Sequence, residues 1–182
     1  DVCSSDLMFS ETHHAPIMEN WGLIWMWHSL VLLVLCSCTN ILSLRGVKEV
    51  SPYLGVWGLG LGTWAAIFWA LRKRMGPVTF VERQIAHAWG ASTAASIGLF
   101  GLERLMGYEV LTLSPILGII GGMVCLFKAG ILSGFFYFFA AASFVVSIIM
   151  ALFPRYQHLY FGVVSALGFF IPGLKYYLRK KK

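Results

Sequence analysis

The chain has 182 residues, of which 58% are hydrophobic and 12% are charged, and its net charge is +6. Soluble domains average about 25% charged residues, so this composition excludes an ordinary soluble domain and favours one membrane unit. The basic residues stand mostly at the ends of apolar runs. That placement indicates contact with lipid head groups and argues against a nucleic-acid partner.

The N-terminal part of the chain is set apart from the rest. Residues 1–7 match the translation of a common sequencing adapter, so we treat them as an artefact and expect the true upstream part to be missing. Residues 8–19 are short and polar and predict a linker. Their pair His13 and His14 is a weak candidate for a metal site.

Six apolar runs then fill residues 20–178, each close to the roughly 20 residues that a helix needs to cross a bilayer core. Backbone groups in hydrocarbon must bond internally, so each run predicts a helix. We predict an all-α, polytopic integral membrane helix bundle with about six transmembrane helices. Five crossings with one re-entrant run are the alternative. The runs are Trp21–Leu44, Tyr53–Leu71, Ile85–Met106, Ser114–Ile131, Gly134–Phe153 and Leu159–Tyr177.

The first run opens with aromatic residues. Trp21, Trp25 and His28 are spaced i, i+4, i+7 and share one helix face. We interpret them as an interfacial belt, because Trp favours the membrane–water boundary. A cofactor-binding cluster is the alternative. Further along this run Cys36 reads as a small packing residue.

Paired glycines mark the second and fourth runs. Gly58 and Gly62 form a GxxxG face, and Gly118 with Gly122 repeats the pattern. Such faces allow close helix approach. We predict contacts within one bundle, and a homodimer is the lesser alternative.

The joint before the third run predicts a sharp helix start. Gly76-Pro77 should stop the preceding helix, and Thr79 with Glu82 forms a capping box. We expect Glu82 and Arg83 to lie at the surface. His87 lies deeper and is a functional candidate, either for a proton-linked role or for packing and hydrogen bonding to a neighbouring helix.

The later runs contain one cation and one proline of note. Lys128 interrupts the fourth run and precedes the small residues 129–134, which predict a tight turn. We therefore expect Lys128 to reach the membrane surface through its flexible stem, with a buried ion-pathway role as the alternative. Pro172-Gly173 is expected to kink the sixth run or end it early.

The distribution of basic residues predicts the orientation. Six crossings place both termini on one side, and the cytoplasmic side then holds ten of the fourteen Lys and Arg residues. We predict a multi-pass protein of the cell inner membrane with both termini and the basic tail at 179–182 in the cytoplasm. The four basic residues outside are Arg45, Lys48, Arg104 and Arg155.

Several long phrases are similar to the C-terminal membrane region of bacterial serine/threonine protein kinases of the planctomycete type. The similarity spans nearly all of residues 50–178. In that family a soluble kinase domain precedes the hydrophobic region. The phrases lie at Leu61–Arg74, Gly76–Trp89, Val110–Val124, Lys128–Gly134 and Phe161–Tyr177.

The resemblance implies an anchor without catalysis. The chain has no Gly-rich ATP loop and no V-A-I-K, H-R-D or D-F-G motif. Kinase chemistry, with ATP and Mg²⁺, would belong to the upstream domain of the same protein, and no catalytic, cofactor or metal residue is assigned here. We expect a membrane-anchoring module of a kinase that also senses a signal.

Two other classes of function stay open. A stand-alone transporter or channel needs paired intramembrane charges or broken helices. An intramembrane enzyme needs convergent His, Asp or Glu groups, whereas the only Asp residues are Asp1 and Asp6.

Overall fold

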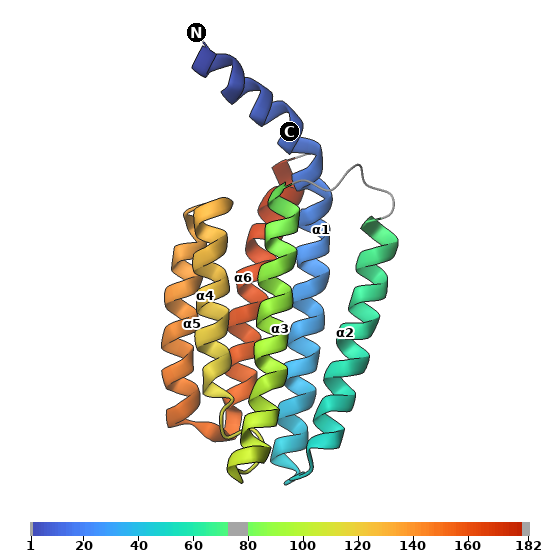
Figure 1. Ribbon diagram of the computed structural model, residues 1–182, viewed down its shortest axis with the longest axis vertical. Helices are drawn as coiled ribbons and strands as arrows, with labels where there is room; N and C mark the ends of the chain where they lie inside the picture. Colours follow the sequence, from blue (N-terminus) through green and yellow to red (C-terminus); the bar gives the residue numbers. More distant parts are fainter. Residues whose placement is uncertain (1, 73–79, 180–182) are drawn as a thin grey trace.

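The computed structural model describes the backbone of residues 2–72 and 80–179, with side chains from 22–70 and 80–178. In these ranges it is a bundle of six α-helices that lie side by side (Figure 1). The helices are α1 Val2–Leu44, α2 Val50–Arg72, α3 Phe80–Met106, α4 Pro115–Ile131, α5 Phe135–Leu152 and α6 Gln157–Arg179, with a 3₁₀ turn, η1, at Pro154–Tyr156.

The bundle has the hydropathy of a membrane protein. Four helical stretches are long and apolar enough to cross a bilayer: Gly22–Leu44, Val50–Ala70, Phe135–Leu152 and Pro154–Leu178. The α4 helix is apolar but has only 17 residues. Charged residues at both ends of α3 lower its hydropathy. The predicted all-α membrane bundle is therefore confirmed.

Most helix boundaries lie within a few residues of the predicted runs. Pro115 occupies the first turn of α4 after Ser114, although the Ser114 hydroxyl makes no capping bond. The α6 helix continues through Pro172 to Arg179, so the expected early end is wrong. The predicted stop at Gly76-Pro77 and the cap at Thr79 lie outside the described residues.

The residues predicted to form a linker lie within α1. Residues 8–19 are helical and continue α1 from Val2 without a break. This part of α1 projects beyond the bundle, on the side where the C-terminal end of α6 also lies (Figure 1). We call this side the terminal end of the bundle.

Four helices form a tightly packed half. The α1 helix packs along α6, α4 packs along α5, and α5 joins the two pairs through α6. Glycines allow the close approach: a Cβ on Gly22 would lie 2.7 Å from the Gly173 carbonyl oxygen, and one on Gly162 would lie 2.6 Å from the Cys36 Cβ. Cys36 is fully buried there, as predicted.

The predicted glycine pair on α4 belongs to this half. A Cβ on Gly118 would lie 2.8 Å from the Ser147 Cα, and one on Gly122 would lie 2.5 Å from the Phe144 ring. In addition, the Ser147 hydroxyl donates to the Pro115 carbonyl at 2.6 Å. The predicted contact within the bundle is confirmed for Gly118 and Gly122.

The remaining helices, α2 and α3, form a loosely attached half. The α2 helix packs mainly on α1, and α3 packs mainly on α4. On α2, Gly58 is exposed, as is Gly62, and a Cβ added to either would meet no atom within 4 Å. The predicted intrabundle contact is wrong for this pair, because their face of α2 points away from the other helices.

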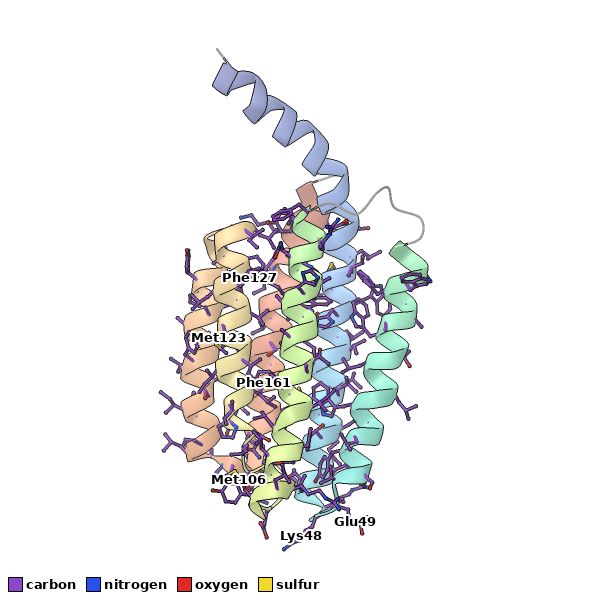
Figure 2. All side chains as sticks on the ribbon, in the orientation of Figure 1. Lys48, Glu49, Met106, Met123, Phe127 and Phe161 are labelled. Atoms are coloured by element: carbon purple, nitrogen blue, oxygen red, sulfur yellow. The ribbon has the colours of Figure 1, made fainter. Side chains whose placement is uncertain are left out.

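Both halves meet at the terminal end of the bundle. An apolar cluster there takes one or more residues from each of the six helices, which close around it. Its buried members are Ile24, Trp25, Trp64, Ile85, Ala129 and Phe136. At the opposite end the connection from α1 to α2 carries Lys48 and Glu49, and α3 ends at Met106 (Figure 2).

Candidate functional site

A cavity of about 240 Å³ separates the loose half of the bundle from the tight half. All six helices contribute to its walls, and apolar atoms dominate its lining. Along α3 it extends from Trp89 to Glu103, which corresponds to roughly 21 Å at 1.5 Å per helical residue. The cavity is therefore long and narrow, and it runs along the helix axes.

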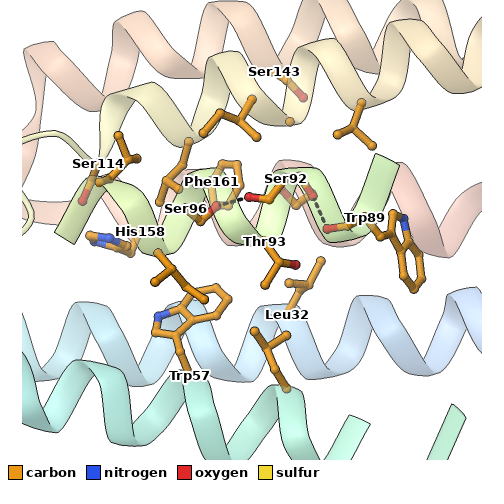
Figure 3. A pocket seen from close by; sticks show the side chains of 18 of the residues that line it. Leu32, Trp57, Trp89, Ser92, Thr93, Ser96, Ser114, Ser143, His158 and Phe161 are labelled. Atoms are coloured by element: carbon orange, nitrogen blue, oxygen red, sulfur yellow. Dashed lines mark hydrogen bonds between the residues drawn. The ribbon is translucent and has the colours of Figure 1, made fainter. Parts of the chain in front are cut away.

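Hydroxyl groups on α3 line the middle of the cavity. Ser92, Thr93 and Ser96 lie along it between Trp89 and the region of His158 (Figure 3). Ser92 donates to the Trp89 carbonyl at 2.9 Å, and Ser96 donates to the Ser92 carbonyl at 2.8 Å. Because these two protons are already used within the helix, the serine hydroxyls offer acceptors but no free donors to the cavity.

Lys128 lies beside the terminal end of the cavity in a cage of aromatic rings. Its Nζ lies 3.8 Å from the centroid of the Phe169 ring and 5.3 Å from that of Trp89. The rings of Trp25 and Phe136 follow at 5.7 and 5.9 Å. These distances fall within the range of cation–π attraction. The expectation that Lys128 reaches the surface is wrong, because its side chain is 0% exposed.

No described side chain neutralises Lys128. Its Nζ is buried without a hydrogen-bond partner, and the only ion pair between two described residues is the exposed one of Lys48 with Glu109. Burying an ion without a partner costs several kcal/mol, of the order of 20 in the idealised limit. Packing of the apolar cluster alone therefore does not explain why a lysine occupies this position.

Two further polar atoms beside Lys128 lack partners. The Trp89 Nε1 and the His28 Nδ1 are buried and make no hydrogen bond within the part of the chain that the structure describes. The two rings are stacked with centroids 4.4 Å apart, and both line the cavity. This end of the cavity thus combines a cation, an indole N–H and an imidazole.

At the opposite end of the cavity Glu103 and Gln157 form a polar network with the α3–α4 segment, while the neighbouring His158 Nδ1 is buried without a partner. The Glu103 carboxylate accepts from the backbone N–H of Leu111 at 3.0 Å and from that of Leu113 at 2.7 Å. The Gln157 amide donates to the Leu111 carbonyl at 3.1 Å. Leu111 has a φ of 72°, a strained value for a residue with a side chain, and these bonds hold it. The network has a structural role in anchoring the α3–α4 segment.

The predicted residues at the start of α3 lie on different faces of the helix. Arg83 is exposed, as expected. Glu82 is 6% exposed, so its predicted surface position is wrong. It precedes the buried Ile85 by three residues, and the face of α3 that carries both turns inward. His87 is exposed on the outer face, which removes it from the neighbouring helices and from the cavity.

The sequence pattern assigns Trp25 and His28, which lie at the terminal end of the cavity, to an interfacial belt. Trp25 is 1% exposed and packs edge-on against Phe136 and Tyr176, so its placement in an interfacial belt is wrong. His28 also points inward, with 8% exposure. The spacing of Trp25 and His28 does indicate their shared face. Their partners Trp89, Phe136 and Phe169 come from three other helices and could not be paired without the fold.

Neither known proteins nor a cluster of metal ligands assigns a function to this cavity. No protein-family model, curated protein or solved structure matches this chain. Among the described residues there is no group of three or more His, Cys, Asp or Glu side chains with metal-binding geometry.

Proposed function

We propose that this chain is the membrane-anchoring and signal-input module of a serine/threonine protein kinase of the planctomycete type. In this proposal the kinase domain precedes α1 in the same protein and carries ATP, Mg²⁺ and all catalytic residues. The bundle resides in the cell inner membrane with both termini in the cytoplasm. It holds the kinase at the bilayer and transmits a change in packing.

The continuous helix α1 carries the proposal. Gly22–Leu44 form the candidate membrane span, and residues 8–21 continue the same helix beyond it. The N-terminal part leaves the terminal end of the bundle as helix (Figure 1). A domain attached there is coupled to the bundle through hydrogen-bonded backbone, which is stiffer than a polar linker.

The division of the bundle supports signal input. A tether needs only one helix, whereas this bundle has a tight half and a loose half with a cavity between them. Packed interfaces switch between discrete arrangements, so a shift of α2 or α3 can be passed to the helix on which each one packs. For α2 that helix is α1, which leads out of the bundle.

The test begins with the gene. Genomic sequencing upstream of the codon for Met8 should show an open reading frame that encodes a kinase domain, and an in-frame stop codon at that point would refute the proposal. Orientation is tested by single-cysteine labelling in intact cells. A cysteine at Lys182 should be protected from an impermeant maleimide, and one at Lys48 should react.

A stand-alone transporter is the second candidate, favoured by Lys128. A buried intramembrane charge marks a substrate or ion pathway in many transporters. However, each described helix is unbroken through the span, whereas transporter sites typically use interrupted helices. Solute uptake by proteoliposomes that contain only this chain would favour the transporter over the kinase module.

A homodimer is a separate proposal about assembly. The exposed glycine face at Gly58 and Gly62 supports it, because small residues permit close approach of a second α2 helix.

A further inference from the structure

We propose that the cavity binds one long-chain fatty acid, with its carboxylate against Lys128 and Trp89 and its alkyl chain along α3 toward His158. This inference does not depend on an upstream kinase. It concerns ligand binding by the bundle itself.

The charge at the terminal end of the cavity selects an anionic head group. Lys128 Nζ and Trp89 Nε1 are hydrogen-bond donors, and both are buried without an acceptor. A carboxylate has two oxygens that can accept one bond from each donor. It would also supply the negative charge that no described side chain places beside Lys128. One ligand group therefore satisfies the unpaired donors and neutralises the buried cation.

Lys128 is positioned to reach that ligand. It follows Val124 and Cys125 by four and three residues, so its stem leaves α4 on the face where those two residues line the cavity. The Phe169 ring and the Trp89 ring each belong to the Lys128 cage and also line the cavity. Lys128 does not itself line the cavity, so pairing with the ligand requires new rotamers of the lysine and of Phe169 that bring Nζ to the cavity wall.

The remaining lining fits an alkyl chain. The hydroxyl protons of Ser92 and Ser96 are bonded to their own helix, and the indole N–H of Trp57 donates to the Thr39 hydroxyl at 3.0 Å. These groups therefore offer no free donor for a second charged group. Thr93, Ser143, Ser165 and His158 add a few further polar groups to the lining, and apolar atoms dominate the rest of the wall along its roughly 21 Å.

The cavity volume restricts the ligand to one chain. Pockets for drug-sized ligands span roughly 300–1,000 Å³, and this cavity is smaller at about 240 Å³. A two-chain phospholipid is far larger, and the length of the cavity along α3 suits one extended chain. The loosely packed boundary between α2 and α3 provides a route of entry from the bilayer.

The test measures binding of tritiated hexadecanoic acid to the whole chain in phosphatidylcholine nanodiscs, with protein-free nanodiscs as background. Unlabelled hexadecanoic acid should compete about tenfold or more better than hexadecan-1-ol, because only the acid pairs with Lys128. Equal competition by the alcohol, by acetate or by a two-chain phosphatidic acid would overturn the proposal. So would an absence of binding above background.

Variants separate the head-group contact from the cavity. Lys128→Met should remove the preference for the acid over the alcohol and retain binding of the alcohol. Trp89→Phe, which keeps a ring but removes the N–H, should lower the preference by a smaller factor. Lys175→Met removes an exposed cation near the same end and should leave the preference unchanged. An unchanged preference in Lys128→Met would overturn the assignment of the head-group contact.

A side chain that fills the cavity should block the binding of both the acid and the alcohol. Ser96→Trp places a large ring in the middle of the lining, and Ala95→Trp is its control on the exposed face of α3. Loss of binding in both variants would refute the location. If Ser96→Trp does not fold, a photoreactive diazirine fatty acid is cross-linked to the unmodified chain. Labelling of peptides that contain residues 92–96 supports the proposal, and labelling confined to exposed faces overturns it.

Discussion

Two glycine pairs of the same spacing, one in the tight half of the bundle and one in the loose half, have opposite surroundings. In the tight half, Gly118 and Gly122 bring α4 against α5. In the loose half, Gly58 and Gly62 of α2 face open space, as does Gly98 of α3. The i, i+4 spacing of the two pairs is the same. Which pair makes contacts is therefore decided by the neighbouring helix, and the motif gives no information about it.

The same division explains where the cavity lies. Glycines bring the backbones of α4 and α5 close together, whereas α3 makes few close backbone contacts with α1 and α6. The cavity is the space that the side chains between these helices do not fill. Beyond the cavity, at the terminal end, large rings pack around Lys128 and the two halves join.

The largest expected effect comes from crowding the tight half. Gly118→Leu forces a side chain against the Ser147 and Ser143 backbone, where a Cβ already lies 2.8–2.9 Å from its neighbours. Overpacking typically costs about 1–3 kcal/mol and more when backbone must move. We expect a loss of about 3 kcal/mol or more in the free energy of unfolding, measured by titration of mixed micelles with SDS.

The matched conservative variant is Gly118→Ala. It adds only the Cβ, so it should cost less than the leucine but remain destabilising. A Gly118→Leu variant as stable as the unmodified chain would contradict the close contact between α4 and α5.

The second effect tests how α3 is anchored. Glu103→Gln keeps one carbonyl oxygen for a backbone N–H but turns an amide donor toward the other, so one of the bonds to Leu111 and Leu113 is lost. An unsatisfied buried donor costs about 1–3 kcal/mol, and we expect a loss of that size in the free energy of unfolding. Faster amide exchange at Leu111 or Leu113 would locate it.

Glu109→Gln is the control for charge alone. Glu109 pairs with Lys48 at 3.2 Å, but both side chains are 81% exposed. Such surface pairs contribute about 0–1 kcal/mol. Equal losses for the Glu103 and Glu109 variants would show that the network around Leu111 has no special role.

Much of the fold could be predicted from the sequence because hydrophobic runs in lipid have few alternatives to helix. The six runs, the start of α4 at Pro115 and the turn between α4 and α5 follow from local patterns. The site could not be predicted in the same way. The cage around Lys128 joins Trp25, Trp89, Phe136 and Phe169 from four helices, and their proximity depends on packing.

The errors have a common physical origin. Proximity to a helix end suggested a surface position for Glu82, Lys128 and Trp25, yet each is buried. At a helix end the side chain can point outward or inward, and the choice depends on whether other helices converge there. In this bundle they converge at the terminal end.

The third effect is on stability and comes from a substitution that does not crowd its neighbours. Lys128→Met replaces the buried cation by an unbranched apolar side chain of similar length. Burying an ion costs several kcal/mol, and a cation–π contact returns about 0.5–2. We expect the free energy of unfolding to rise by about 1 kcal/mol, the lower end of the gain found when buried ion pairs are replaced by apolar residues. A fall of that size in the same SDS titration would assign Lys128 a structural role in the apolar cluster.

The smallest effect is expected on the exposed face of α2. Gly58→Leu adds the same side chain as the α4 variant, but no atom lies within 4 Å of its Cβ position. Glycine in a helix interior costs about 0.5–1 kcal/mol relative to alanine, so the variant should be unchanged or slightly more stable in the SDS titration. A large loss would mean that a second copy covers the face. Mass measurement in detergent separates the two cases, since Gly58→Leu with Gly62→Leu lowers the mass only if a dimer forms there.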